Sequence, residues 1–558
     1  MKTLLSRLGP VILACALLLV AFPLPADAQA DLRIEVSFPS TLHADPVTGR
    51  VFVMISKNGA REPRFQVGFW GGETPFFGAD VEQLKPGQAA VIDAGTLGYP
   101  ADSLKDIPAG DYYVQALLNV YTRFNRADGH VIWAHNDQWE GQQFNHSPGN
   151  LFSEVQKAHL DPAAGYSLKL TLTGVIPPIA VPQDTQWVKR VKFESKLVSR
   201  FWGQPMYLGA TVLLPKGYDA HPDVRYPVVY YQGHFGLGAP LGFRAEETAP
   251  GQTTARGSFY QKWISEDYPR LIVVEFQHPT PYFDDSYAVN SANNGPYGDA
   301  IMTELIPYLE EHFRIIRKPY ARLLTGGSTG GWESLALQVL HPDFFGGTWT
   351  LFPDPVDFRR YQLINIYSDD NAFQAPGHQW MIPERPMMRS VEGQMLQTVR
   401  QMSQLEEVLG SKGRSGQQYE AWEAVYGPVG DDGYPKPLWD KRTGRIDHDV
   451  ALYMRDHGYD LRYYIETHWK EIGPKLVGKL HFQCGDMDHF YLNSSLYMLE
   501  DFLGKTDNPP YGGSFEWGRP MKGHGWVSMP MPDLLRVMAD RARKNAPAED
   551  NSNAWQYK

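Results

Sequence analysis

Residues 323–332, Leu-Leu-Thr-Gly-Gly-Ser-Thr-Gly-Gly-Trp, decide the fold of this chain. An apolar run leads into a serine flanked by glycines, and apolar residues at helical spacing follow it. Gly326, Ser328 and Gly330 fit the G-x-S-x-G pattern of a nucleophile elbow, in which a strand turns sharply into a helix. Residues two positions from the serine must lack a Cβ atom so that strand and helix do not collide. The pattern places Ser328 at a helix N-terminus, where free N–H groups favour an oxyanion.

Taken alone, the same residues also fit a loop rich in glycine and serine. The flanking segments must therefore distinguish a nucleophile elbow from such a loop. Continuous apolar runs at 226–234 and 271–276 predict buried parallel strands, and 297–313 has helical spacing. Further strands are predicted at 347–352, 475–484 and 514–517, a closing helix at 532–544, and an antiparallel hairpin from 191–194 and 208–215. Strands that alternate with helices predict an α/β fold with a mostly parallel sheet.

Two further polar segments follow predicted strands. Asp486 and Asp488 come directly after the strand 475–484, and His524 lies in a loop after the strand 514–517. Such loops meet at the carboxyl edge of a parallel sheet, where ligands bind. A serine nucleophile needs a base, and a histidine base needs a carboxylate to fix its tautomer. The order Ser328, aspartate, His524 is the chain order of an α/β-hydrolase triad.

Four segments together resemble the putative esterase family, the esterase D, feruloyl esterase and enterochelin-esterase-like α/β hydrolases. They are Tyr-Pro-Val-Val-Tyr-Tyr-Gln-Gly-His (226–234), Gly-Gly-Ser-Thr-Gly-Gly-Trp (326–332), Cys-Gly-Asp-Met-Asp (484–488) and Gly-His-Gly-Trp (523–526). The resemblance covers roughly residues 185–545 and implies an α/β-hydrolase fold with a serine esterase activity. The chain departs from the family in a long insertion at 353–474 and in Thr329, where many relatives carry methionine or glutamine.

The resemblance also implies roles for individual residues. Ser328 would be the nucleophile and His524 the base. Relatives place the acid three residues after a glycine that ends a strand, which favours Asp488 and leaves Asp486 as the alternative. The oxyanion hole would use the N–H of Thr329 and the backbone N–H of His234, unless His234 merely lines the pocket. His278, His341, His378, His448 and His489 are better interpreted as surface or structural histidines.

The first third of the chain differs from the rest. Residues 31–175 show alternating or apolar runs at 51–55, 112–120 and 166–172, separated by turn residues, which predicts an all-β, sandwich-like N-terminal domain. A proline-rich linker at 176–184 follows. Aromatic residues of this third fit either a sugar-binding face or, more commonly, the core of the domain: Trp70, Phe76, Phe77, Tyr112, Tyr121 and Trp133.

The insertion at 353–474 breaks the rhythm of strands and helices and is rich in aromatic residues. It predicts a lid over the site, with some aromatic side chains forming an apolar wall. The alternative is that these residues form the insertion's own core. They are Phe373, Trp380, Tyr419, Trp422, Tyr426 and Trp439. A polar tail occupies residues 546–558.

Residues 1–30 have the pattern of a signal peptide. Lys2 and Arg7 precede an apolar run over residues 11–22, and Ala26-Asp27-Ala28 fits a cleavage site. We therefore expect a secreted or periplasmic protein whose mature chain carries a net charge near −12, because residues 1–28 contribute +1 to the total of −11. Only Cys484 would remain, which excludes an internal disulfide and favours a buried strand thiol over a catalytic one.

The negative charge argues against binding of nucleic acid or of anionic membranes, and no later segment is long and apolar enough to span a bilayer. We expect no cofactor and no metal, and the oligomeric state is open. The best-supported function is hydrolysis of small-molecule or carbohydrate-linked esters. A serine peptidase of the same fold and a binding protein without catalysis are the alternatives.

Overall fold

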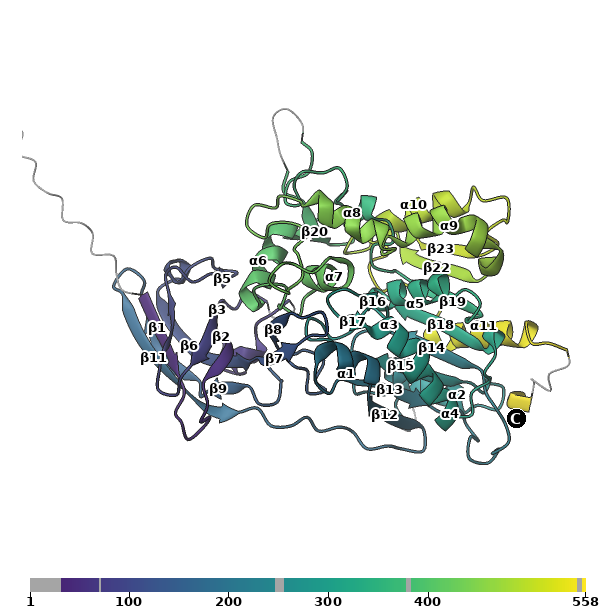
Figure 1. Ribbon diagram of the computed structural model, residues 1–558, viewed down its shortest axis with the longest axis horizontal. Helices are drawn as coiled ribbons and strands as arrows, with labels where there is room; N and C mark the ends of the chain where they lie inside the picture. The colour runs from purple at the N-terminus through teal and green to yellow at the C-terminus, as the bar shows by residue number, and fades with distance from the viewer. Residues whose placement is uncertain (1–31, 70–71, 246–254, 378–382, 549–553, 558) are drawn as a thin grey trace, which may run out of the picture.

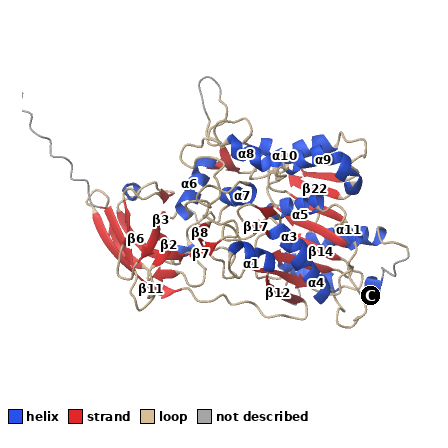
Figure 2. Ribbon diagram, in the orientation of Figure 1, coloured by secondary structure: helices blue, strands red, loops and turns tan. Residues whose placement is uncertain are grey.

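The computed structural model describes residues 32–69, 72–245, 255–377, 383–548 and 554–557. The predicted signal peptide, Trp70, His378 and Trp380 lie outside these residues, so the structure does not bear on them. The described part separates into an N-terminal β region on one side and a larger sheet with helices on the other (Figure 1). A group of helices that includes α6, α7 and α8 lies above and between these two parts (Figure 2).

The larger part contains an eight-stranded sheet that matches the predicted α/β pattern. In spatial order its strands are β12 (Val188–Glu194), β13 (Tyr207–Leu213), β15 (Ile272–Gln277), β14 (Val228–Gln232), β18 (Arg322–Gly327), β19 (Gly347–Leu351), β22 (Leu480–Gly485) and β23 (Ser514–Gly518). The contacts of β13 with β12 and with β15 are antiparallel, and the remaining neighbours are parallel. The six strands with parallel neighbours, β15, β14, β18, β19, β22 and β23, therefore have their carboxyl ends at one edge.

Helices cover this sheet and complete two apolar cores. The helices are α1 (Lys196–Trp202), α2 (Ala255–Ile264), α3 (Tyr297–Ala300), α4 (Ile306–His312), α5 (Thr329–Leu340), α9 (Leu461–Leu476), α10 (Asn493–Leu503) and α11 (Met531–Lys544). Apolar side chains of α4 and α11 pack with β13, β14 and β15, whereas those of α5, α9 and α10 join a second core with β22. A π-helical turn, Ile301–Leu305, links α3 and α4 within the single helix predicted there.

The turn between β18 and α5 leaves no room for side chains at two glycines. A Cβ on Gly330 would lie 2.1 Å from the carbonyl oxygen of Gln232, at the end of β14. A Cβ on Gly326 would lie 2.3 Å from the carbonyl oxygen of Gly330. Ser328 itself has φ 58° and ψ −123°, a conformation that L-residues rarely adopt. Both predicted glycines are thus required for the sharp turn that exposes the serine.

The N-terminal β region, residues 32–175, contains the predicted strands and, in its described part, no α-helix. Its strands are β1 (Leu32–Ser37), β2 (Val47–Ser56), β3 (Phe76–Leu84), β4 (Ala90–Asp93), β5 (Gly98–Tyr99), β6 (Gly110–Val120), β7 (Thr122–Asn125), β8 (Val131–Ala134), β9 (Leu151–Ser153), β10 (Gln156–Leu160) and β11 (Tyr166–Val175). All but β7 and β8 belong to one hydrogen-bonded sheet. Phe76, Phe77, Tyr112 and Tyr121 are buried, as the core interpretation predicts, and Trp133 is partly buried.

Strand β2 joins the two halves of the molecule. Val51, Val53 and Ile55 face the core of the N-terminal β region, while Phe52 and Met54 belong to the core that contains α5 and the insertion. The buried Arg50 also donates to the carbonyl oxygens of Glu407 and Val408. The proline-rich segment 176–184 has no regular structure and runs along the outside of the molecule (Figure 1). The contacts through β2 therefore hold the N-terminal β region against the insertion.

The insertion consists of β20 (Pro386–Arg389), β21 (Met395–Thr398), α6 (Val399–Leu409), α7 (Gln418–Tyr426), α8 (His448–Asp456) and connecting loops. Five of the aromatic residues singled out in the sequence are buried in the core that the insertion shares with α5: Phe373, Tyr419, Trp422, Tyr426 and Trp439. The last part of the predicted insertion is different. Helix α9 packs against α5 and so belongs to the helices beside the sheet.

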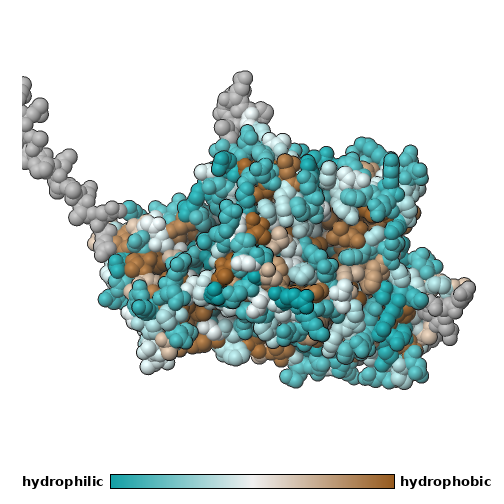
Figure 3. All heavy atoms as spheres, in the orientation of Figure 1, coloured by the Kyte–Doolittle hydropathy of each residue, from teal (hydrophilic) through white to brown (hydrophobic). Residues whose placement is uncertain are grey.

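The surface seen in Figure 3 is mostly hydrophilic, with apolar residues in small groups. None of the helices in the described ranges combines the length and apolar composition that crossing a bilayer requires. Cys484 is buried in β22, where burial raises the pKa of its thiol well above the usual value. The predicted structural role of this cysteine agrees with its position.

Gly330→Ala tests the close approach at the turn. Because the added methyl group would overlap the carbonyl oxygen of Gln232, we expect the free energy of unfolding to fall by roughly 1–3 kcal/mol. Urea unfolding followed by circular dichroism would measure the change. Gly238→Ala is the matched control, since a Cβ there meets nothing within 4 Å. Equal stability of the two variants would contradict the geometry of the turn.

Candidate active site

Polar residues from six loops gather at the carboxyl edge of the sheet. Each follows a different parallel strand: His234 after β14, Asp284 and Asp285 after β15, Ser328 after β18, Asp354 after β19, Asp488 after β22 and His524 after β23. A cavity of about 760 Å³ opens at this edge, and Ser328, His524, His234, Asp284 and Asp354 line it. The sheet therefore brings the predicted site residues to one place.

Backbone hydrogen bonds hold Ser328 at the first turn of α5. Its carbonyl oxygen accepts from the N–H groups of Gly331, Trp332 and Asp354 at 2.9, 3.1 and 3.1 Å, and its own N–H donates to Leu351. The N–H of Thr329 has no backbone acceptor among the described residues. A free N–H at a helix N-terminus next to the serine is the geometry that an oxyanion hole requires.

His524 is paired with Asp488. Its Nδ1 lies 2.7 Å from Oδ2 of Asp488, whose side chain is completely buried. The other carboxylate oxygen of Asp488 accepts from the N–H groups of Phe490 and Leu492. Asp486 instead accepts from the N–H of Lys522. Of the two candidate acids, the structure places Asp488 beside the imidazole.

Two phenylalanines fix the orientation of the His524 ring. The rings of Phe352 and Phe490 meet it edge-on, with centroid distances of 4.8 and 5.0 Å. Phe352 has φ 33°, which is an outlier for a bulky residue and is typical of strain near a functional site. Within the described residues, Ser328 Oγ makes its hydrogen bond to Asp354 Oδ1, at 3.4 Å, and not to His524.

Asp354 was not predicted from the sequence, yet its carboxylate accepts the hydrogen bond of the serine hydroxyl. Its side chain is buried, and four groups donate to its Oδ2: Tyr287 Oη (2.7 Å), Thr329 Oγ1 (3.1 Å), Gln418 Nε2 (3.1 Å) and Trp422 Nε1 (3.3 Å). Burial raises the pKa of this carboxyl, and the hydrogen bonds oppose the rise. Its place after a central strand, at the edge where ligands bind, was the available signal.

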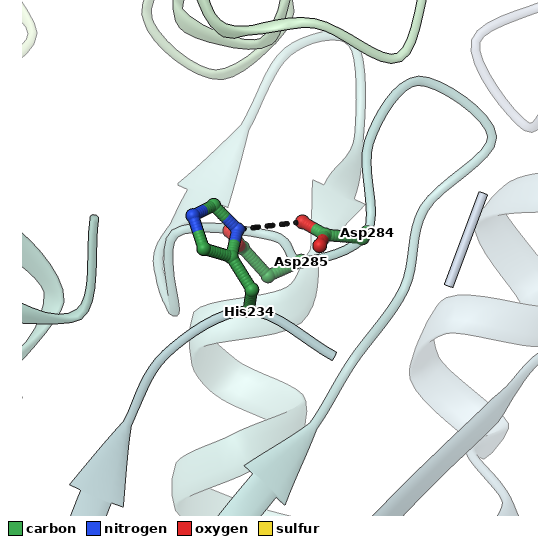
Figure 4. A group of neighbouring side chains, drawn as sticks. All are labelled: His234, Asp284 and Asp285. Carbon is green, nitrogen blue, oxygen red and sulfur yellow. Dashed lines mark hydrogen bonds and ion pairs between the residues drawn. The ribbon is translucent and has the colours of Figure 1, made fainter. Parts of the chain in front are cut away.

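His234 faces a pair of aspartates (Figure 4). Its Nδ1 lies 3.1 Å from Asp284 Oδ1 and 3.6 Å from Asp285 Oδ2. The charge of Asp284 raises the pKa of His234 to about 10, against the effect of desolvation. The side chain of His234 is half exposed and lines the cavity. The sequence predicts a catalytic role only for its backbone N–H, with lining of the pocket as the alternative. The backbone role of His234 in the oxyanion hole stays a prediction.

A second, fully buried group lies behind this pair. Glu333 of α5 and His278 are buried, with 3.9 Å between His278 Nε2 and Glu333 Oε1. Burial raises the pKa of both Glu333 and Asp285 well above the usual range and lowers that of His278 to about 4. His278 therefore has the structural position that the sequence interpretation assigned to it.

The walls of the cavity come from three parts of the chain. The N-terminal β region contributes Phe65, Phe69, Gln143, Phe144 and His146, among others. The insertion contributes Gln362, Met387, Met402, Gln418 and Trp422. Of the described insertion aromatics singled out in the sequence, only Trp422 lines the cavity, so the core interpretation describes the others better. The contribution of residues 61–69 and 141–146 carried no recognisable signal in the sequence.

Comparisons with known proteins agree with the resemblance. The family described as "Putative esterase" matches residues 205–373, which include Ser328, and this match supports an ester hydrolase. Comparison with curated protein sequences gave no match.

Several solved structures are similar. A ferulic acid esterase is 16% identical over 64% of this chain and 98% of its own, with a TM-score of 0.36. An S-formylglutathione hydrolase from Agrobacterium tumefaciens is 14% identical over 65% and 99%, with a TM-score of 0.33. Serine hydrolase FphF of Staphylococcus aureus is 14% identical over 64% and 98%, with a TM-score of 0.31.

The contact between His524 and Asp488 predicts that replacing Asp488 lowers activity far more than replacing Asp486. Asp488→Asn should lower kcat for a nitrophenyl ester by roughly 10³–10⁴, because an amide at this position favours the wrong tautomer of the histidine. Asp486→Asn is the matched control and should retain most of the activity, since its carboxylate faces a backbone N–H. Steady-state kinetics of both variants checks the ranking. A larger loss in Asp486→Asn would contradict the assignment.

Proposed function

We propose that this chain is an exported serine carboxylesterase that acts through Ser328, His524 and Asp488 and forms an acyl-enzyme intermediate. The observation that carries the proposal is the placement of Ser328, on a strained turn, in the same cavity as a histidine held by a buried aspartate. The esterase family match over residues 205–373 covers the serine and supports the class of reaction. The aspartate and histidine follow in the expected order.

Each residue has a defined step. Ser328 Oγ attacks the ester carbonyl carbon while Nε2 of His524 takes its proton, and Asp488 stabilises the resulting imidazolium through Nδ1. The N–H groups of Thr329 and His234 would stabilise the oxyanion. The histidine then gives the proton to the leaving alcohol. Water, deprotonated by the same histidine, hydrolyses the acyl-serine and regenerates the hydroxyl.

The hydroxyl of Ser328 must change its partner for this chemistry. It lies 3.4 Å from Asp354 Oδ1, a weak hydrogen bond that rotation about χ1 can break. Catalytic hydrogen bonds are commonly long or absent without substrate and form in the complex. We therefore assign to Asp354 the role of holding the free hydroxyl at the elbow, and to His524 the role of base once the ester is bound.

The cavity favours esters with a polar or aromatic portion. Its volume of about 760 Å³ suits a small molecule or a short carbohydrate-linked group. Phe65, Phe144 and Trp422 provide aromatic surface, while Gln143 and Gln418 supply amide groups. The N-terminal β region restricts the space above Ser328, which favours small substrates over a folded protein. A serine peptidase would share the triad, and peptide anilides distinguish it from an esterase.

The export proposal depends on the sequence alone. Residues 1–30 have the composition of a signal peptide, and the one cysteine that would remain is buried, so the mature protein needs no reducing compartment. Fractionation of producing bacterial cells, with N-terminal sequencing of the product, would test both export and cleavage after Ala28.

Ser328→Ala should remove nearly all hydrolysis of short nitrophenyl esters, because the attacking oxygen is lost. Thermal unfolding should stay close to that of the unchanged protein, since Ser328 Oγ makes one weak hydrogen bond. Ser494→Ala, in α10 and outside the cavity lining, is the matched control. Turnover by a folded Ser328→Ala protein would exclude the triad and require another nucleophile.

Changes in the cavity wall should alter substrate preference rather than the nucleophile. Phe65→Ala and Trp422→Phe should each raise KM for aryl esters several-fold, because they remove aromatic contacts or a hydrogen bond to Asp354. The rate of Ser328 labelling by a small fluorophosphonate should change little. Tyr497→Ala, an exposed aromatic residue on α10, serves as the control. Unchanged KM in both variants would show that these walls do not contact substrate.

A further inference from the structure

We infer that His234, Asp284 and Asp285 form a binding site for a divalent transition-metal ion beside the proposed nucleophile. One imidazole nitrogen and two carboxylate oxygens converge there from the loops after β14 and β15 (Figure 4). The three ligand atoms lie within 4.8 Å of one another. The sequence did not indicate this site, because His234 is 50 residues from Asp284 and the three residues share no ligand spacing.

The distances fit shared coordination. His234 Nδ1 lies 3.1 Å from Asp284 Oδ1 and 3.6 Å from Asp285 Oδ2. Two ligand atoms each about 2.1 Å from a zinc ion are separated by roughly 3.0 to 3.5 Å in octahedral or tetrahedral geometry. A proton on Nδ1 can serve Asp284, but at 3.6 Å it makes no hydrogen bond with Asp285. A single cation among the three atoms would contact all of them.

The burial of Asp285 is the second reason to place a metal ion at this site. Its side chain is 1% exposed, and Oδ2 has no hydrogen-bond partner among the described residues. Both carboxylate oxygens of the neighbouring Glu333 also lack such a partner in the described part of the chain, and that side chain is fully buried. Buried carboxylates without donors are costly unless they take up a proton or a cation balances them. The position of Asp285 Oδ2, aimed at His234 Nδ1, shows where that cation would bind.

A neighbouring cluster of His278, Asp285 and Glu333 has a similar composition but does not fit a metal ion. The backbone N–H of Ser286 donates to His278 Nδ1 at 2.9 Å, so this nitrogen holds a lone pair and the proton of the neutral ring is on Nε2. Since Nε2 is the atom that faces Glu333, His278 offers a donor and not a ligand there. Glu333 therefore lies behind Asp285 as a buried carboxyl group and is not itself assigned as a ligand.

The site is open to the cavity. The side chains of His234 and Asp284 are 50% and 21% exposed, and both line the cavity that contains Ser328. Three protein ligands leave a coordination position free for water or for an oxygen atom of a substrate. A mixed set of imidazole and carboxylate ligands suits Zn²⁺ or Mn²⁺ better than Mg²⁺ or Ca²⁺. The inference concerns binding and does not depend on the identity of the nucleophile.

Metal content of the full-length folded protein tests the site. After treatment with a chelator and dialysis against zinc or manganese chloride, mass spectrometry of the bound metal should show one ion per chain. Asp285→Asn and His234→Gln should each weaken metal binding by at least about tenfold. This is the lower end of the loss in affinity expected when residues around a metal ion are replaced. Binding should also raise the midpoint of thermal unfolding in a concentration-dependent manner.

Two controls keep the test decisive. Asp111→Asn disrupts a solvent-exposed ion pair with His159, whose Nδ1 lies 2.7 Å from Asp111, and should leave metal binding unchanged. Ser328→Ala should bind metal like the unchanged protein, which separates this inference from the proposed reaction. If Asp285→Asn does not fold, Asp284→Asn at the more exposed position replaces it. If a folded ligand variant binds zinc and manganese as tightly as the unchanged protein does, the inference is overturned.

Discussion

The backbone of α5 passes so close to the end of β14 that no side chain fits at Gly330. The carbonyl oxygen of Gln232 occupies the place of a Cβ, and Gly326 is restricted in the same way by Gly330. This approach forces the sharp turn after β18 and leaves Ser328 at φ 58° on the first turn of the helix. The position of the Thr329 N–H at the helix N-terminus, beside the loop after β14, follows from the same contact. The remainder of the site is arranged around this turn.

Parallel strands explain why distant segments supply that site. Because β14, β15, β18, β19, β22 and β23 end at one edge, loops that are far apart in the sequence meet around Ser328. The insertion and the N-terminal β region then close the space above, and β2 is buried on both faces between them. Catalytic geometry thus depends on the sheet, whereas the size and lining of the cavity depend on the added parts.

Local sequence patterns predicted the sheet and the elbow well, because apolar runs and glycine spacing reflect local packing. Ser328, Asp488 and His524 could be placed for the same reason, since each follows a recognisable strand. The walls at residues 61–69 could not, because their proximity to Ser328 arises from long-range packing without a spacing pattern. Asp354 also follows a predicted strand, but no motif distinguishes it from other loop aspartates. The insertion aromatics show the opposite case. Their composition fitted either a wall or a core. Among those in the described ranges, Phe373, Tyr419, Tyr426 and Trp439 pack into a core, and only Trp422 lines the cavity.

The pairing of His524 with a buried Asp488 fits a base that serves a neighbouring nucleophile, the role we propose for Ser328 at the elbow. Incubation with a fluorophosphonate, followed by proteolysis and tandem mass spectrometry, tests this assignment most directly. The account predicts one adduct per chain, located on Ser328, and slower labelling when His524 is replaced by glutamine. A protein that is folded but remains unlabelled, or an adduct on another residue, would contradict it.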